Sequence, residues 1–117
     1  MLDKILEIQA ELDASIGKRH YSVLPVGKND KIKMLGLALN QEVAELIDST
    51  NWKWWRSKMD MYDEENIKVE LVDILHFLAS AFNTMEMTAE DVYNAYLEKV
   101  KINYQRQKDG YGGTEKM

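Results

Sequence analysis

The chain of 117 residues contains no cysteine. Disulfide scaffolds and thiolate metal sites are therefore excluded, and the composition fits the reducing environment of the cytoplasm, where we expect the protein to reside. Long apolar runs are absent as well, and no stretch is long enough to span a bilayer. The N-terminal segment MLDKILEIQAELDASIGKRH also lacks the basic start and the continuous apolar core of a signal peptide.

Basic residues are in the minority, because 20 acidic residues stand against 15 lysines and arginines and give a net charge of −5. A protein that holds nucleic acid by neutralising phosphates shows the opposite balance. The composition therefore predicts no nucleic-acid partner and, with the missing apolar runs, no membrane partner. A small anionic ligand held through a metal ion is compatible with it.

Proline is almost absent, with Pro25 as the single example, and apolar residues recur with the helical period along most of the chain. No strand pattern is evident. We expect four helices, which cover about residues 2–16 (ended by Gly17), 30–50 (capped by Asn29 or Asp30), 63–85, and 88–107 (opened by the capping-box sequence TAED).

These helices predict an all-α fold, a four-to-five-helix antiparallel bundle. We expect one helical domain over residues 1–108 and a flexible C-terminal tail over residues 109–117. A core of this size is marginal on its own, so we expect the chain to assemble as a homodimer.

Carboxylates occupy positions in two of these helices where apolar residues would be expected. In the segment LALNQEVAELIDSTNWKWW, Glu42 lies within the helical stripe of Leu35, Leu39 and Leu46, and Glu45 lies at its edge. The third helix repeats the arrangement, with Glu70 and Asp73 beside an expected core face of Ile67, Leu71, Ile74, Leu78 and Met85. The pattern is E-x-x-E, 24 intervening residues, and E-x-x-D.

Four carboxylates near a core repel one another and are unfavourable to bury without partners. Divalent cations would compensate, and oxygen-only ligands favour Mg²⁺ or Mn²⁺ over Zn²⁺. A di-iron bundle would need E-x-x-H on two helices, and neither of the two histidines forms that motif. Protonation, pairing with lysines, or a solvated groove is the alternative, but two acidic pairs on two core faces favour a metal site.

Gln9 is a polar residue in the apolar row of Ile5, Leu12 and Ile16, and Asp13 lies one turn further on. A buried amide needs partners for its oxygen and its nitrogen, and the imide edge of a pyrimidine would supply both. Bonds to backbone or water are the alternative for Gln9, and an ordinary surface position is the alternative for Asp13.

The last helix passes from apolar to basic along one face, through Val92, Tyr96, Lys99, Asn103 and Arg106. The two cations suit phosphate oxygens, and Asn103 suits a base or sugar. Cations that merely complement the helix dipole and nearby acids are the alternative.

The segment NWKWW follows the first acidic pair. Its aromatic rings could pack a helix end or an interface, or Trp52 and Trp54 could line a nucleotide site with Lys53 near phosphate. His76 could orient a sugar hydroxyl or cap a polar patch, and Phe77 could stack on a base or belong to the core.

Together these motifs resemble the all-α nucleoside triphosphate pyrophosphohydrolases of the MazG-like superfamily, and within it the dimeric dUTPases. The resemblance lies in the two acidic pairs, IQAELD in the first helix, NWKWW, ELVDILHF, and KINYQRQKDGY near the C-terminus. These segments cover most of the chain in the order found in that family.

The resemblance implies a helical dimer that hydrolyses dUTP to dUMP and pyrophosphate with Mg²⁺, for which Mn²⁺ could substitute. The implied metal ligands are Glu42, Glu45, Glu70 and Asp73. The implied substrate contacts are Gln9 at the uracil edge, His76 and Phe77 by the base or sugar, and Lys53, Lys99, Asn103 and Arg106 at phosphate or nucleoside. Asp13, Trp52 and Trp54 complete the candidate substrate-binding set.

The expected chemistry follows from charge. A triphosphate and a four-carboxylate site repel each other, and Mg²⁺ inverts the local field and bridges phosphate oxygens. A metal-activated water would attack the triphosphate, with the central Glu42 as the candidate catalytic base. Lys99 and Arg106 would stabilise the leaving pyrophosphate.

Two rival functions stay open. One is a related pyrophosphohydrolase that acts on dCTP or on modified or assorted nucleoside triphosphates, and only Gln9 and its neighbours bear on that choice. The other is a non-enzymatic helical interaction module, whose acidic faces and tryptophans would bind a partner protein.

Overall fold

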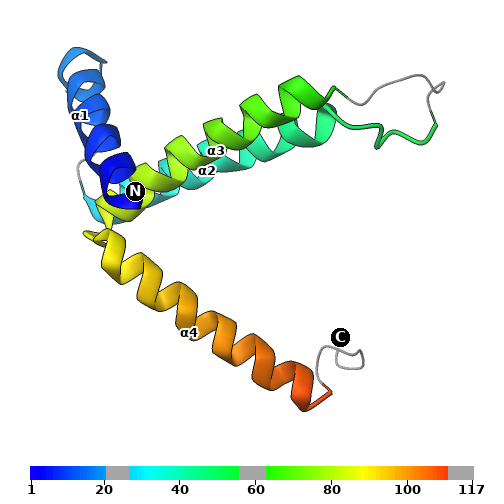
Figure 1. Cartoon of the computed structure of the whole chain (residues 1–117). Coiled ribbons are helices and arrows are strands. Elements are labelled where there is room, and N and C mark those ends of the chain that lie inside the picture. The colour runs from blue at the N-terminus through cyan, green and yellow to red at the C-terminus, as the bar shows by residue number, and fades with distance from the viewer. Residues whose placement is uncertain (21–26, 56–62, 111–117) are drawn as a thin grey trace. The chain divides into compact units, whose positions relative to one another are not determined.

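Four α-helices make up the computed structural model, which describes residues 1–20, 27–55 and 63–110, with only the backbone of 17–20. They are α1 (Leu2–His20), α2 (Lys28–Asp48), α3 (Glu64–Thr84) and α4 (Ala89–Lys108) (Figure 1). No strand occurs in these ranges, so the prediction of an all-α fold is confirmed. The chain divides into two compact units, Met1–Glu86 and Met87–Met117. Residues 111–117 of the predicted tail lie outside the described residues.

The first helix is longer than the sequence predicted, because α1 continues through Gly17 to His20. The prediction that Gly17 ends this helix is wrong. A glycine inside a helix costs only about 1 kcal/mol relative to alanine, and the lysine and arginine that follow it are good helix formers.

The second helix begins at Lys28, after Gly27 as its N-cap, and Gly27 provides no side-chain hydrogen bond. The prediction of Asn29 or Asp30 as the cap is therefore wrong. Asp30 lies instead in the first turn, where its negative charge interacts favourably with the positive end of the helix dipole.

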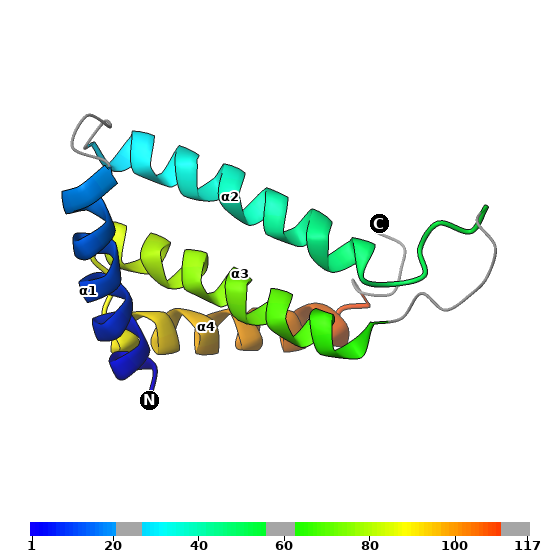
Figure 2. The same ribbon diagram turned by 90° about the horizontal axis from the view of Figure 1, so that it is seen from above.

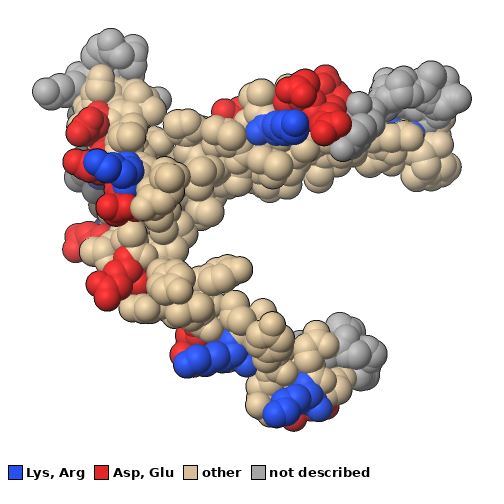
Figure 3. Space-filling view, in the orientation of Figure 1, with Lys and Arg blue, Asp and Glu red and all other residues tan. Residues whose placement is uncertain are grey.

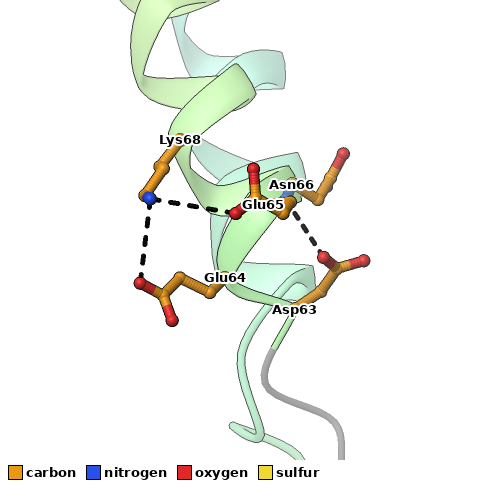
Figure 4. A network of polar contacts seen from close by, with 5 residues as sticks. All are labelled: Asp63, Glu64, Glu65, Asn66 and Lys68. Atoms are coloured by element: carbon orange, nitrogen blue, oxygen red, sulfur yellow. Dashed lines mark hydrogen bonds and ion pairs between the residues drawn. The ribbon is translucent and has the colours of Figure 1, made fainter.

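The third helix begins with a side-chain cap, in which Asn66 N donates to Asp63 Oδ1 at 3.0 Å (Figure 4). Glu64 and Glu65 occupy the first turn, and the Lys68 ammonium lies 3.8 Å from a carboxylate oxygen of each. These exposed ion pairs contribute little to stability. The cap and the acidic first turn explain why α3 begins where the sequence predicted.

The fourth helix, described by itself, begins with the predicted capping box. Asp91 N donates to Thr88 Oγ1 at 3.1 Å, and Thr88 N donates to Asp91 Oδ2 at 2.9 Å. Two otherwise unpaired backbone N–H groups are thereby satisfied.

Within the first unit, α2 and α3 form an antiparallel hairpin, and α1 packs across the C-terminal half of α3 (Figures 1 and 2). Asn83 Nδ2 donates to the carbonyl of Leu6 at 2.9 Å, which ties the beginning of α1 to the end of α3. At the open end of the hairpin, the Lys28 ammonium lies 3.3 Å from the Glu86 carboxylate. This arrangement places the acidic pairs of α2 and α3 along one interface.

Few apolar side chains are buried in the described residues, where Leu6 and Ala79 make up the buried apolar core. The expected core face of α3 is largely exposed in the single chain, with Leu71 at 51%, Leu78 at 37% and Met85 at 49% exposure. The prediction of a core position is therefore wrong for these three residues in one chain, because α1 and α2 cover only part of the surface of α3. Ile67 and Ile74 of the same predicted face are half-buried. On the face visible in Figure 3, most of the described hairpin surface is uncharged.

None of the helices in the described ranges combines the length and apolarity that crossing a membrane requires.

Candidate metal centre

Three acidic side chains from two helices converge at the interface of α2 and α3. Glu42 and Glu45 are one turn apart on α2, and Glu70 faces them from α3. One carboxylate oxygen from each of the three lies within 4.8 Å of the other two. The i, i+3 spacing places the two α2 carboxylates on one helix face, and the antiparallel hairpin brings the third to the same level.

Two oxygens of this cluster, Glu42 Oε1 and Glu70 Oε1, are buried without a hydrogen-bond partner among the described residues. Glu70 as a whole is only 7% exposed. Glu45 differs, because its Oε2 accepts a hydrogen bond from Gln41 Nε2 at 3.1 Å. A buried carboxylate oxygen without a donor is strongly unfavourable, so a donor or a cation that the described residues do not supply would stabilise both oxygens.

The cluster raises the pKa of Glu42 from 4.5 to about 7. The largest cause is a hydrogen bond with Glu70, which becomes available only when Glu42 is protonated, because two carboxylates are both acceptors. Partial removal from water raises the pKa further, as do the negative charges of Glu45, Glu70 and Asp73. Without a cation, the centre would relieve its repulsion by taking up a proton.

The residues present fit a hard divalent cation. The donors are all oxygens, three of them come within reach of one ion, and two lack any other partner. Of the four acids that the sequence singled out, the structure gathers Glu42, Glu45 and Glu70. Asp73 is half-buried and close enough to act on the pKa of Glu42, but it is not part of that group.

Gln9 lies in a polar network between α1 and α3. Its residue is 6% exposed, its Nε2 donates to Asp13 Oδ1 at 3.0 Å, and its Oε1 is 2.7 Å from Nδ1 of His76. The Asp13 carboxylate can only accept a hydrogen bond, so the amide N–H of Gln9 points to Asp13 and the amide oxygen points to His76. The amide oxygen is an acceptor, so Nδ1 of His76 is the donor in that hydrogen bond. Gln9 thus bonds side chains of α1 and α3, and its amide has the capacity for one further hydrogen bond as donor and one as acceptor.

Asp13 is a half-buried member of this network, because its second oxygen accepts from Ser80 Oγ at 2.6 Å. Sequence reasoning missed Ser80, which is 5% exposed. The helical spacing of Asp73, His76 and Ser80 would have placed all three on one face. A serine in a helix gives no signal by itself, however.

The aromatic segment after α2 is exposed. Trp52 Nε1 donates to Asp48 Oδ1 at 3.0 Å, and the ring of Trp55 packs edge-on against those of Trp52 and Trp54. The ammonium of Lys53 lies 5.5 Å from the ring centroid of Trp52. Trp54 is 85% exposed, so its ring is available to a ligand or a partner chain.

Phe77 and three residues of α4 are the remaining candidates for substrate binding. Phe77 is half-buried on α3, next to His76. Lys99, Asn103 and Arg106 are exposed on α4, which belongs to the second unit, and their role at the site stays a prediction.

Comparison with known proteins agrees with the sequence motifs. A family model described as dUTPase matches residues 1–90. A dCTP pyrophosphatase of Enterobacteria phage T4 is 36% identical over 74 residues, which cover 54% of this chain and 43% of that protein. A dCTP pyrophosphatase of Enterobacteria phage LZ5 is 31% identical over the same shares. The chain thus spans less than half the length of these curated relatives, and no solved structure matches it.

The raised pKa of Glu42 predicts how the stability of the metal-free protein depends on pH. Below about pH 4.5 the side chain is neutral in both states, and between pH 4.5 and 7 it ionises in the unfolded chain first. The free energy of unfolding should therefore fall as pH rises through this window. Urea denaturation in EDTA from pH 4 to 8 would measure the fall.

Glu42→Gln provides the matched control, because glutamine stays neutral at every pH. The variant should gain stability relative to the wild type as pH rises towards 7, and the difference should level off above it. A difference that is constant from pH 4 to 8 would contradict the electrostatic description of the cluster.

Proposed function

The chain belongs to the all-α dimeric dUTPase family, and from this premise we propose that it is a metal-dependent nucleoside triphosphate pyrophosphohydrolase that converts dUTP to dUMP and pyrophosphate. The observation that carries the proposal is the convergence of Glu42, Glu45 and Glu70, where two buried oxygens have no hydrogen-bond partner in the part of the chain that the structure describes. A module that only bound a basic protein would present its carboxylates to solvent, whereas Glu70 is buried.

Mg²⁺ is the proposed cofactor, with Mn²⁺ as a substitute. Glu42, Glu45 and Glu70 would hold it, and Asp73 is proposed as a further ligand from one turn along α3. When bound, the ion would neutralise the triphosphate and make water a better nucleophile. Glu42, with its unpartnered oxygen in the middle of the group, is proposed to orient the attacking water and accept its proton.

The base would be read by the network of Gln9, Asp13 and His76. His76 lies six positions after Glu70, which corresponds to about 9 Å along α3. One extended nucleotide could therefore reach both the carboxylates and the network. The further donor and acceptor capacity of Gln9 suits the edge of a pyrimidine, and Phe77 beside His76 would contact the base or sugar.

Cationic and aromatic side chains would bind the rest of the substrate. Lys53 is proposed to contact phosphate beside Trp52 and Trp54. From α4, Lys99, Asn103 and Arg106 are proposed to contact phosphate or nucleoside, and the two cations would stabilise the departing pyrophosphate.

A second candidate substrate is dCTP, because both named relatives are dCTP pyrophosphatases. The network also permits it: Asp13 accepts hydrogen bonds, and cytosine offers an amino group next to a ring acceptor.

A homodimer is the proposed assembly. Leu71, Leu75 and Leu78 recur at i, i+4 and i+7 on α3, and each is at least 37% exposed in the single chain. Such a stripe is the usual interface of a helix with a partner helix. A second copy of this chain would cover it and enlarge a core that one chain leaves small.

The function is tested by incubating the protein with Mg²⁺ and each common deoxynucleoside triphosphate, and by separating the products on an ion-exchange column. We expect dUMP and pyrophosphate from dUTP. Loss of outer partners of metal ligands costs 10–100-fold, so loss of a ligand in Glu70→Gln should lower turnover by at least about 100-fold.

Glu64→Gln is the control for that variant, because Glu64 is an exposed acid of the same helix that pairs only with Lys68 among the described residues. It should keep wild-type turnover. Full activity of Glu70→Gln would remove Glu70 from the metal centre. Absence of turnover in the wild type, with Mn²⁺ as well, would favour the interaction module.

Base selectivity should depend on Gln9. A hydrogen bond to the base is worth about 1.4 kcal/mol, which corresponds to a tenfold factor. Gln9→Leu should therefore change the ratio of kcat/KM for dUTP over dTTP or dCTP by about tenfold, while the metal requirement is kept. Asn83→Leu removes a different hydrogen bond between α1 and α3 and should leave the ratio unchanged. Equal ratios in all three proteins would mean that Gln9 only joins the helices.

Assembly is tested by sedimentation. The wild type should sediment with the mass of two chains. Leu71→Lys should lower the mass towards that of one chain, because a lysine buried in the dimer interface would have no partner for its charge. Glu65→Lys places the same side chain at an exposed position of the same helix and should remain dimeric. A wild type that sediments as a single chain would refute the dimer.

A further inference from the structure

A buried serine joins the end of α2 to the beginning of α3. Ser49 is 6% exposed, and its Oγ accepts a hydrogen bond from Asn66 Nδ2 at 2.6 Å. The same Oγ donates to the carbonyl of Glu45 at 3.2 Å. The backbone carbonyl of Ser49 also accepts from Asp63 N at 3.0 Å. The hydroxyl thus connects the backbone of one metal-site residue to the opposite helix.

This link stands in register with the carboxylates. Ser49, the C-cap of α2, lies four residues after Glu45, and Asn66 lies four residues before Glu70 on α3. In an antiparallel pair, residues whose numbers have a constant sum lie at the same level. The pair Ser49–Asn66 has the same sum as Glu45–Glu70, so the link and the carboxylates are one helical turn apart on both helices.

We propose that Ser49 and Asn66 are positioning residues, whose hydrogen bond fixes the register of α2 against α3 and thereby holds Glu45 opposite Glu70 for the metal ion. The inference rests on the proposed function, because it concerns the same metal centre. Neither residue touches the ion or the substrate in this proposal.

A metal ion requires its ligands to be placed accurately, which is the reason why a hydrogen bond that fixes the register of α2 against α3 matters. A slip of one residue moves a helix by about 1.5 Å along its axis and turns each side chain by about 100°. Metal ligands tolerate deviations of only about 0.2 Å. The exposed pair of Lys28 and Glu86 also joins the two helices, but it lies at the far end and is screened by solvent.

The test measures affinity for Mg²⁺ and Mn²⁺ alone, by isothermal titration of the full chain, together with the stability of the metal-free protein. Ser49→Ala deletes the hydroxyl and keeps the backbone bond to Asp63, so the hairpin remains closed. We expect about tenfold weaker metal binding, as for other residues that support metal ligands. Ser49→Thr retains the hydroxyl and should restore affinity.

Two further variants keep the test decisive. Asn66→Ala breaks the same hydrogen bond from the α3 side. The helix cap, in which the backbone N–H of Asn66 donates to the Asp63 carboxylate, stays intact. This variant therefore replaces Ser49→Ala if Ser49→Ala does not fold. Lys28→Gln removes the distant link and should leave metal affinity within about twofold of the wild type, which is far smaller than the effect of losing ligand support.

The possible results distinguish a failure of the positioning role of Ser49 from a failure of the metal centre itself. If the wild type binds the metal and Ser49→Ala binds it equally well, losing only metal-free stability, the link is purely structural and the inference is overturned. If the wild type binds neither metal, the proposed metal centre itself fails, and the inference fails with it.

Discussion

Mutual repulsion of carboxylates at the interface of α2 and α3 is the constraint on which the rest of this structure depends. Carboxylate oxygens of Glu42, Glu45 and Glu70 lie within 4.8 Å of one another, and two buried oxygens of the group have no hydrogen-bond donor among the described residues. Negative charges this close repel one another. A proton relieves part of this repulsion, as the raised pKa of Glu42 shows. A divalent cation would relieve more, because it binds several oxygens at once. The interface between α2 and α3 therefore carries an electrostatic cost in the empty chain, which a bound cation would offset.

The apolar surface supports the same description. A hairpin that carries acids in its interior has fewer positions for a core of its own, and leucines of α3 remain exposed in the single chain. The first unit consequently owes much of its order to hydrogen bonds, such as those of Gln9, Ser49 and Asn83. Binding of metal, substrate and a second chain would each add to its stability by mass action.

Much of the fold could be predicted because its signals are local. The capping box of Thr88 and Asp91 lies within four residues, and the meeting of Glu42 with Glu70 follows from helical period and an antiparallel turn. Gly17 was misjudged because neighbouring residues outweigh the small helical penalty of one glycine. The exposure of Leu71 was missed because periodicity identifies an apolar face but not what covers it. Ser80 shares a helical face with Asp73 and His76, but a serine gives no signal by itself, and its hydrogen bond to Asp13 forms only when α1 is docked.

The network between α1 and α3 bears on the order in which the protein folds. Gln9 and His76 are 67 residues apart in the chain, as are Asp13 and Ser80, whereas α2 and α3 are neighbours in sequence. Contacts between distant segments carry a larger entropy of loop closure and form late. The acidic cluster of α2 and α3 is therefore the local part of the site, whereas the network of Gln9, Asp13, His76 and Ser80 is the part that waits for α1 to dock.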